Sequence, residues 1–190
     1  VLGRPLHTGG GNDSPRPASQ RAAAFILTAA LLTGAAFPAF AGTYHIEEGD
    51  IVISAGTEAG TNKVEQGGTL KSENDTGTII TGKSDKNTVT IEAKNENDKV
   101  EVTLDNVNIK TTGGKAAVSV TGKGDTTIEL NGDNELSGSG AHAALEHNQT
   151  VDGEGNVTSG ELTIQDKDKN GSLEAVGGFK GAGIGSAGSN

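Results

Sequence analysis

The sequence predicts an all-β fold and, within that class, a parallel β-helix, a single-stranded solenoid in which each coil stacks on the last. Three observations lead to this prediction. Residues 100–138 contain short runs in which apolar and polar residues alternate, the period that places one face of a strand on a core. Gly, Asn and Asp separate the runs at short intervals. After Gly42 no window has a helical period and no proline occurs, which excludes folds that alternate strands with helices.

The expected strands follow one another along the chain after residue 42. They are short and aliphatic, and the pattern of strand and Asn/Gly turn recurs, which favours the β-helix over the alternative fold, a β-sandwich with longer strands and bulkier core residues. Residues 57–68, 131–134 and 150–160 are expected to be turns or loops, and 138–145 a weak strand of small residues. The other expected strands are 44–46, 51–53, 69–70, 78–81, 88–92, 100–104, 107–109, 116–120, 128–130, 161–165 and 172–176.

Residues 1–42 are expected to be a leader that ends in a secretory signal peptide. Positive residues precede the apolar run 22–32, and small residues surround a cleavage site near Ala41. The run is shorter than the ~20 residues of a membrane-spanning helix, and Pro38 interrupts its far end, so the signal peptide is favoured over an anchor. Residues 43–190 would then be the mature β-helix domain. Its abrupt Gly-rich end leads us to expect that the natural protein continues.

Charge and cysteine content limit the partners of the chain. The formal net charge is −10 at pH 7, and all three arginines lie in the predicted leader. An acidic secreted chain without arginine is a poor candidate for binding nucleic acid or anionic membranes. With no cysteine, neither disulfides nor thiolate metal sites can form. We therefore expect a secreted or cell-surface protein that binds no nucleic acid and does not insert into membranes after cleavage.

Three segments carry a resemblance to known proteins. VTLDNVNI (102–109) and GGKAAVSVTGKGDTTIELNGDNELSG (113–138) resemble secreted bacterial carbohydrate-binding β-helix domains of the pectin-binding type. LTIQDKDKNGSLEAVGGFKGAGIGS (162–186) is similar to GAGIG-type repeats of large bacterial surface proteins. The resemblance covers about residues 88–186. It implies a right-handed parallel β-helix, an extracellular location and calcium-assisted binding of acidic polysaccharide such as pectin.

The sharpest local motif is a candidate calcium loop. Asp166, Asp168 and Asn170 stand at positions 1, 3 and 5 and are followed by glycine, the spacing with which oxygen ligands wrap a calcium ion. Glu174 is a further candidate ligand. Position 12 is Gly177 instead of the bidentate glutamate of the standard loop. The alternative interpretation is a simple Asp/Asn/Gly turn between two coils.

Other polar residues are weaker candidates for a site. A solenoid can align turn carboxylates into an acidic ridge, although solvated turns are the alternative for each. The histidines show no metal-binding spacing and are expected on the surface, with 142 and 147 on opposite faces of an extended segment. The candidate oxygen ligands are Asp152, Glu154, Asn156, Asp105, Asp125 and Asp133, and the histidines are His45, His142 and His147.

No catalytic constellation is readable, so we expect a protein that is not an enzyme. Polysaccharide lyases of this architecture usually need a basic residue, often arginine, and hydrolases need paired carboxylates at a fixed separation. The expected function is an extracellular carbohydrate-binding or adhesin-like surface module. Its partner would be a polysaccharide containing uronic acid, bound through polar and calcium-bridged contacts because the mature chain keeps only Tyr44 and Phe179 as aromatic residues. A structural stalk without a ligand is the alternative, and a lyase or hydrolase is less favoured.

Overall fold

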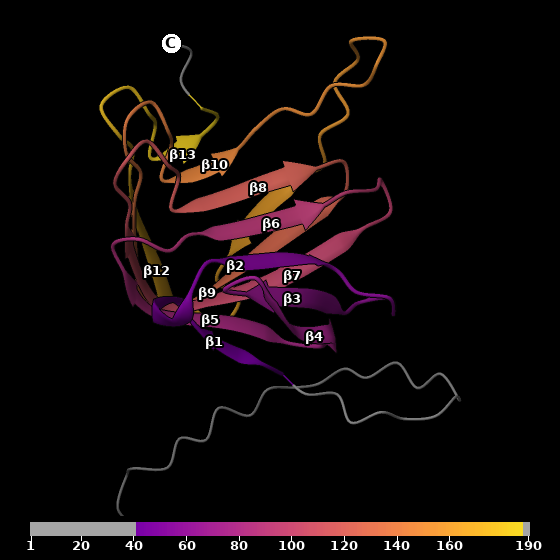
Figure 1. Ribbon diagram of the computed structural model, residues 1–190, viewed down its shortest axis with the longest axis horizontal. Helices are drawn as coiled ribbons and strands as arrows, with labels where there is room; N and C mark the ends of the chain where they lie inside the picture. Colours follow the sequence, from indigo (N-terminus) through magenta and orange to yellow (C-terminus); the bar gives the residue numbers. More distant parts are fainter. Residues whose placement is uncertain (1–40, 188–190) are drawn as a thin grey trace, which may run out of the picture. The chain divides into compact units, whose positions relative to one another are not determined.

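The computed structural model describes residues 41–187, which form an all-β structure of two sheets (Figure 1). The predicted leader lies outside these residues except for its last two. No helix in residues 41–187 is long and apolar enough to cross a membrane. The elements are β1 (Thr43–His45), the 3₁₀ turn η1 (Ile46–Glu48), β2 (Ile51–Ala55), β3 (Asn62–Gln66), β4 (Thr69–Asp75), β5 (Thr78–Ser84), β6 (Val89–Ala93), β7 (Lys99–Lys110), β8 (Val118–Gly122), β9 (Asp125–Ser137), β10 (Leu145–His147), β11 (Leu162–Gln165), β12 (Gly171–Val176) and β13 (Ile184–Gly185).

Parallel pairing dominates both sheets. The first sheet has the order β1-β5-β7-β9-β11, with β12 also on β9, and the second has the order β13-β10-β8-β6-β2-β3-β4. Strand β3 pairs antiparallel with β2 and with β4, and every other pairing between the named strands is parallel. Outside these strands, Val151 and Val157 form an isolated antiparallel bridge. From β5 to β10 the chain enters the two sheets alternately. Neighbouring strands of one sheet therefore come from successive passages of the chain.

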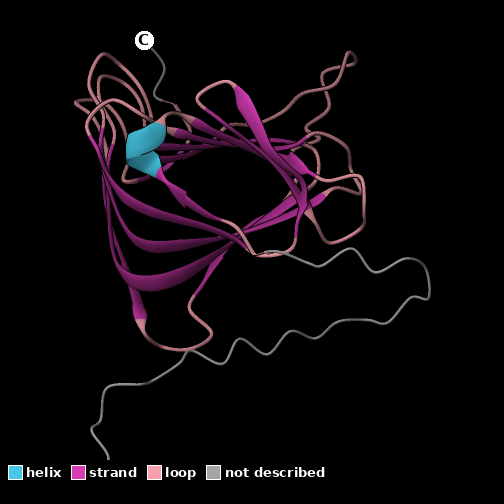
Figure 2. Ribbon diagram, turned by 60° about the horizontal axis from the view of Figure 1, so that its bottom comes forward, coloured by secondary structure: helices cyan, strands magenta, loops and turns pink. Residues whose placement is uncertain are grey.

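The two sheets face each other across the interior (Figure 2). The core between them consists of aliphatic side chains and Tyr44. Val102 pairs with Ile128 and Leu104 with Leu130, and Leu104 and Ile128 are fully buried. Burying one such side chain stabilises a fold by about 1.5–3 kcal/mol. The predicted alternation is therefore confirmed as the pattern that selects the inward face. The other fully buried large side chains include Ile46, Ile51, Ile53, Ile80, Ile91, Ile109, Leu136 and Leu145.

Strands β7 and β9 are longer than predicted. The polar pair at 105–106 and the predicted turn 131–134 lie inside continuous strands, with an irregularity in the register between Asp105 and Asn108. Asn106 adopts φ 53°, and the buried Asn134 accepts the Val107 N–H at 3.0 Å through Oδ1. Asn134 Nδ2 also donates to the Ser172 carbonyl at 3.1 Å. The Asn134 side chain thus hydrogen-bonds backbone groups at a bulge, at a position where the sequence suggested a turn.

Two further predictions were wrong. The predicted loop 57–68 contains β3, because Asn62 and Gln66 are buried polar residues whose amides find partners. Asn62 Nδ2 donates to Thr78 Oγ1 at 2.8 Å, and Gln66 Nε2 donates to the His45 carbonyl at 2.6 Å. The predicted weak strand 138–145 is mostly irregular chain and turn that precedes β10, and Gly140 adopts a left-handed φ of 64° there.

Candidate functional site

A lysine-lined cleft of about 500 Å³ lies at the ends of β5 and β7. We call it the lysine cleft and define it by Lys83, Lys86 and Lys110, with the amides of Asn87 and Asn108. All three lysines are exposed. Among the described residues, the lysine–carboxylate ion pairs are Lys63–Glu65 at 2.8 Å and Lys94–Glu92 at 3.1 Å, and neither involves the cleft. The cleft therefore presents ammonium groups that are available to a ligand.

The fold positions these side chains from both sides of the cleft. Lys83 on β5 is in register with Asn108 on β7, and Lys110 is the last residue of β7. The turn after β5 is held by Ser84, whose Oγ accepts the N–H groups of Lys86 at 3.2 Å and Asn87 at 2.8 Å. Asn87 Nδ2 donates to the Ile46 carbonyl at 2.8 Å. The turn that carries Lys86 is therefore anchored at its base.

Glu47 is the acidic neighbour of the cleft. Its Oε1 accepts the backbone N–H of Lys83 at 2.8 Å, and this bond lowers the pKa of Glu47. A hydrogen bond that favours the ionised form of a carboxyl has this effect. The lining of the cleft thus contains three lysines and two carboxylates, Glu47 and Asp85, and no ion pair joins them. The balance favours an anion, in contrast to the acidic chain as a whole.

The predicted calcium loop is a closed turn between β11 and β12. Asp166 Oδ1 accepts the Asn170 N–H at 3.0 Å, and Lys169 adopts φ 55°. Asp168 is exposed, and Glu174 lies on β12 in register with Glu135. In residues 41–187, no group of three or more His, Cys, Asp or Glu side chains is arranged to hold a metal ion. Calcium binding by Asp166, Asp168, Asn170 and Glu174 stays a prediction.

The other candidate oxygen ligands cap the backbone or contact neighbouring strands. Asp152 accepts the backbone N–H groups of Glu154 at 2.9 Å and Asn156 at 2.8 Å. The side-chain amide of Asn156, followed by its backbone N–H, lowers the pKa of Asp152. Asp105, Asp125 and Asp133 do not stack into an acidic ridge, because they are in register with Asn131, Lys99 and Ser172, respectively.

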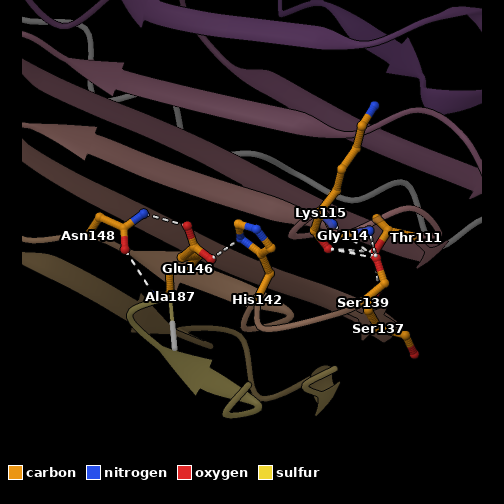
Figure 3. Close-up of polar contacts among 9 residues, drawn as sticks. All are labelled: Thr111, Gly114, Lys115, Ser137, Ser139, His142, Glu146, Asn148 and Ala187. Carbon is orange, nitrogen blue, oxygen red and sulfur yellow. Dashed lines mark hydrogen bonds and ion pairs between the residues drawn. The ribbon is translucent and has the colours of Figure 1, made fainter. Parts of the chain in front are cut away.

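His142 is held by a buried carboxylate that sequence reasoning missed. Its Nδ1 lies 2.8 Å from Glu146 Oε2, and Glu146 is only 4% exposed (Figure 3). Asn148 Nδ2 also donates to Glu146, and Asn148 Oδ1 accepts the Ala187 N–H at 3.0 Å. The expectation that 142 and 147 share one extended segment was wrong, since His142 lies in the turn before β10. The only signal in the sequence for this contact was the spacing of four residues between His142 and Glu146.

A second cleft, of about 410 Å³, lies between residues 55–62, the turn before β5 and the start of β7. Its wall contains the carboxylates of Glu58, Asp98 and Glu101, with the buried Asp75 beside them. Asp75 accepts the Tyr44 hydroxyl at 2.7 Å and the Gly42 N–H at 3.0 Å, so it is satisfied within the fold. This cleft is opposite in charge to the lysine cleft.

Comparison with protein-family models, curated proteins and solved structures gave no match to the chain. The resemblance to pectin-binding β-helix domains therefore stays a prediction from the residues that carry it.

Proposed function

We propose that the chain is a carbohydrate-binding or adhesin-like module of the extracellular space or cell surface, and that the lysine cleft binds acidic polysaccharide. The observation that carries the proposal is the group of three lysines without a carboxylate partner in an otherwise acidic chain. A uronate supplies the missing negative charges. The side-chain oxygens of Asn87 and Asn108 add acceptors for sugar hydroxyls, since their amide nitrogens donate within the fold, to the Ile46 carbonyl and to Glu135.

The scaffold of this module is, in our proposal, a right-handed parallel β-helix with one inserted hairpin. The parallel ladders of β5, β7 and β9 in the first sheet, and of β6, β8 and β10 in the second, support it. Strands β3 and β4 form the insertion, because they interrupt this order with antiparallel pairing. A β-sandwich with antiparallel hairpins throughout would not place successive strands side by side in parallel.

Calcium is a second candidate component, located at Asp166, Asp168, Asn170 and Glu174. The closed turn already gives these oxygens a fixed backbone, and Lys169 holds its left-handed conformation there. In the proposed function, calcium at this turn would provide a second contact for uronates. The lysine cleft binds uronates directly, without calcium. A stalk without any ligand remains the alternative function, supported by the repeated ladders alone.

The affinity of the protein for polygalacturonate tests the proposed function. We expect the double variant Lys83→Ala/Lys86→Ala to bind about 10-fold more weakly, since two exposed charge contacts of up to ~1 kcal/mol each are lost. The matched control, Lys99→Ala/Lys123→Ala, removes the same charge outside the cleft and should bind almost as the parent does. Isothermal titration calorimetry gives both affinities. Equal losses in the two variants, or no binding by the parent protein, would contradict the proposal.

Thermal unfolding in millimolar calcium tests calcium binding separately from ligand binding at the lysine cleft. We expect calcium to raise the melting temperature of the parent and to have no effect on Asp166→Asn/Asp168→Asn, because a ligand that binds only the folded state stabilises it. Magnesium serves as the control ion. An unchanged melting temperature in the parent would remove calcium from the proposal and leave the lysine cleft intact.

A further inference from the structure

A second positively charged surface adjoins the lysine cleft, and we call it the turn ridge. It consists of three turns that lead from the first sheet to the second, residues 111–117, 138–144 and 177–183. They contain no Asp or Glu, although the chain has a net charge of −10. Their ionisable side chains are Lys115, His142 and Lys180. Such a segregated surface attracts anions.

The three turns stack directly on one another (Figures 1 and 2). The Ser139 N–H donates to the Lys115 carbonyl at 2.9 Å, which joins the first turn to the second. The Lys180 N–H donates to the Gly140 carbonyl at 3.3 Å and joins the second turn to the third. Neighbouring strands in a sheet are ~4.8 Å apart, so the ridge runs across the strands. Lys110 directly precedes the first turn and connects the ridge with the lysine cleft.

Ser139 fixes the conformation of the first two turns. Its Oγ accepts the N–H groups of Gly114 and Lys115, each at 3.0 Å, and lies 3.2 Å from Thr111 Oγ1. Figure 3 shows the Lys115 side chain pointing away from this cluster. In residues 41–187, neither Lys115 nor Lys180 forms an ion pair. Both ammonium groups are exposed and available.

Glycines and one aromatic ring shape the surface between these charges. Gly113 adopts φ 77° with open space where a side chain would lie, and Gly140, at φ 64°, packs so closely that a Cβ would be 3.2 Å from Gly114 Cα. The ridge therefore carries no side chain at these two positions. Phe179, on the third turn, is 94% exposed. An aromatic ring left in water is a surface for an apolar partner, such as one face of a sugar ring.

His142 adds a polar edge to the ridge. Because its Nδ1 faces the buried Glu146 carboxylate at 2.8 Å, the opposite edge of the ring, with Nε2, is left for a ligand (Figure 3). The side-chain amide of Asn148 donates a hydrogen bond to the other carboxylate oxygen of Glu146, Oε1. The imidazole is thus oriented by the fold.

We propose that the turn ridge is a second binding surface, on which an acidic polysaccharide runs across the coils from the lysine cleft. Its carboxylates contact Lys115 and Lys180, one sugar ring packs on Phe179, and His142 contacts the chain between them. The inference rests on the proposed function and extends it, since it makes binding depend on chain length. A short oligomer fills the lysine cleft alone, whereas a long one also covers the ridge.

The experiment compares two probes, a galacturonic acid trimer and long polygalacturonate, by calorimetry. We expect Lys115→Ala/Lys180→Ala to weaken binding of the long chain about 10-fold and Phe179→Ala about fivefold, with affinity for the trimer unchanged. The matched controls are Lys99→Ala/Lys123→Ala for charge and Leu70→Ala for a half-exposed apolar side chain elsewhere. Methyl-esterified polygalacturonate, which lacks the charges, should lose the effect of the lysine variant but keep that of Phe179→Ala.

Three outcomes decide between the two proposals. Loss of long-chain affinity in the ridge variants but not in their controls supports the turn ridge. Unchanged long-chain affinity in the ridge variants, with a loss in Lys83→Ala/Lys86→Ala, overturns the ridge and leaves the lysine cleft. Absence of binding of both probes to the parent overturns both proposals. Circular dichroism of each variant verifies that its fold is retained.

Discussion

Tyr44 is the residue whose ionisation is most strongly tied to the fold. It is 8% exposed, and its hydroxyl donates to Asp75 Oδ2 at 2.7 Å. Burial, followed by the hydrogen bond to the Asp75 carboxylate, raises the pKa of Tyr44 well above its ordinary value of 10.0. The neutral phenol is therefore favoured in the folded state.

This shift predicts a loss of stability in alkali. Below pH 10.0 both states keep the Tyr44 proton, and above it only the unfolded state releases it, so stability falls as the pH rises past 10.0. Urea unfolding should show a shallower decline in Tyr44→Phe, which also loses ~1–3 kcal/mol at neutral pH because Asp75 loses a donor. The chain has a single tyrosine, so phenolate absorbance reports on it alone. Phenolate formation near pH 10.0 in protein that is still folded would contradict the prediction.

At the scale of elements, glycines set how closely successive strands and turns pack. Gly122 ends β8 in register with Ala93 of β6, at φ 109°. A Cβ at this position would overlap the carbonyl group of Ala93. Gly113 has a comparable left-handed conformation, φ 77°, with open space around it. A substitution at Gly113 therefore tests backbone strain alone, whereas one at Gly122 tests backbone strain together with steric overlap.

We therefore predict unequal effects of two alanine substitutions. Gly113→Ala should cost about 1–2 kcal/mol, the price of a left-handed conformation for a residue with a Cβ. Gly122→Ala should cost about 3 kcal/mol or more, because the backbone of β6 must also move. The free energy of unfolding in urea measures both. Equal costs would show that the strands adjust without penalty.

Across the described residues, burial declines toward the last strands. Ile184 of β13 is in register with Leu145, which is fully buried, yet Ile184 is 48% exposed. Leu173 and Ala175 of β12 are only partly buried, whereas their partners on β9, Asn134 and Leu136, are buried. Fewer buried contacts lower the free energy of local opening. Local stability is therefore expected to be lower in these last strands than in β7 and β9.

Hydrogen exchange measures this gradient. Amides of β12 and β13 should exchange faster than those of β7 and β9, because β7 and β9 are paired on both sides and face the core with fully buried side chains. Mass spectrometry of peptides from the exchanged protein resolves the two regions. Equal protection of β13 and β9 would contradict a graded structure.

The candidate sites depended on tertiary structure more than on motif. Lys83 and Lys110 are distant in the sequence and come together only because β5 and β7 pair in parallel with a bulge between Thr81 and Gly82. The number of residues between neighbouring strands varies, so the register of two lysines cannot be counted from the sequence. The candidate calcium motif was readable because its residues are close together in the sequence, and in the structure they form a turn closed by Asp166.

By itself, the sequence determined that the part of the chain the structure describes is all-β, because a period of two selects one buried face whatever the strands pair with. It also located most strands, since Val, Ile and Leu alternate there with polar residues. Only the tertiary structure decided that Asn134 lies inside a strand, that β3 pairs antiparallel and that Glu146 is buried. From the sequence alone, a polar side chain is expected to be exposed, and only its hydrogen-bond partners, which come from distant parts of the chain, determine whether it can be buried.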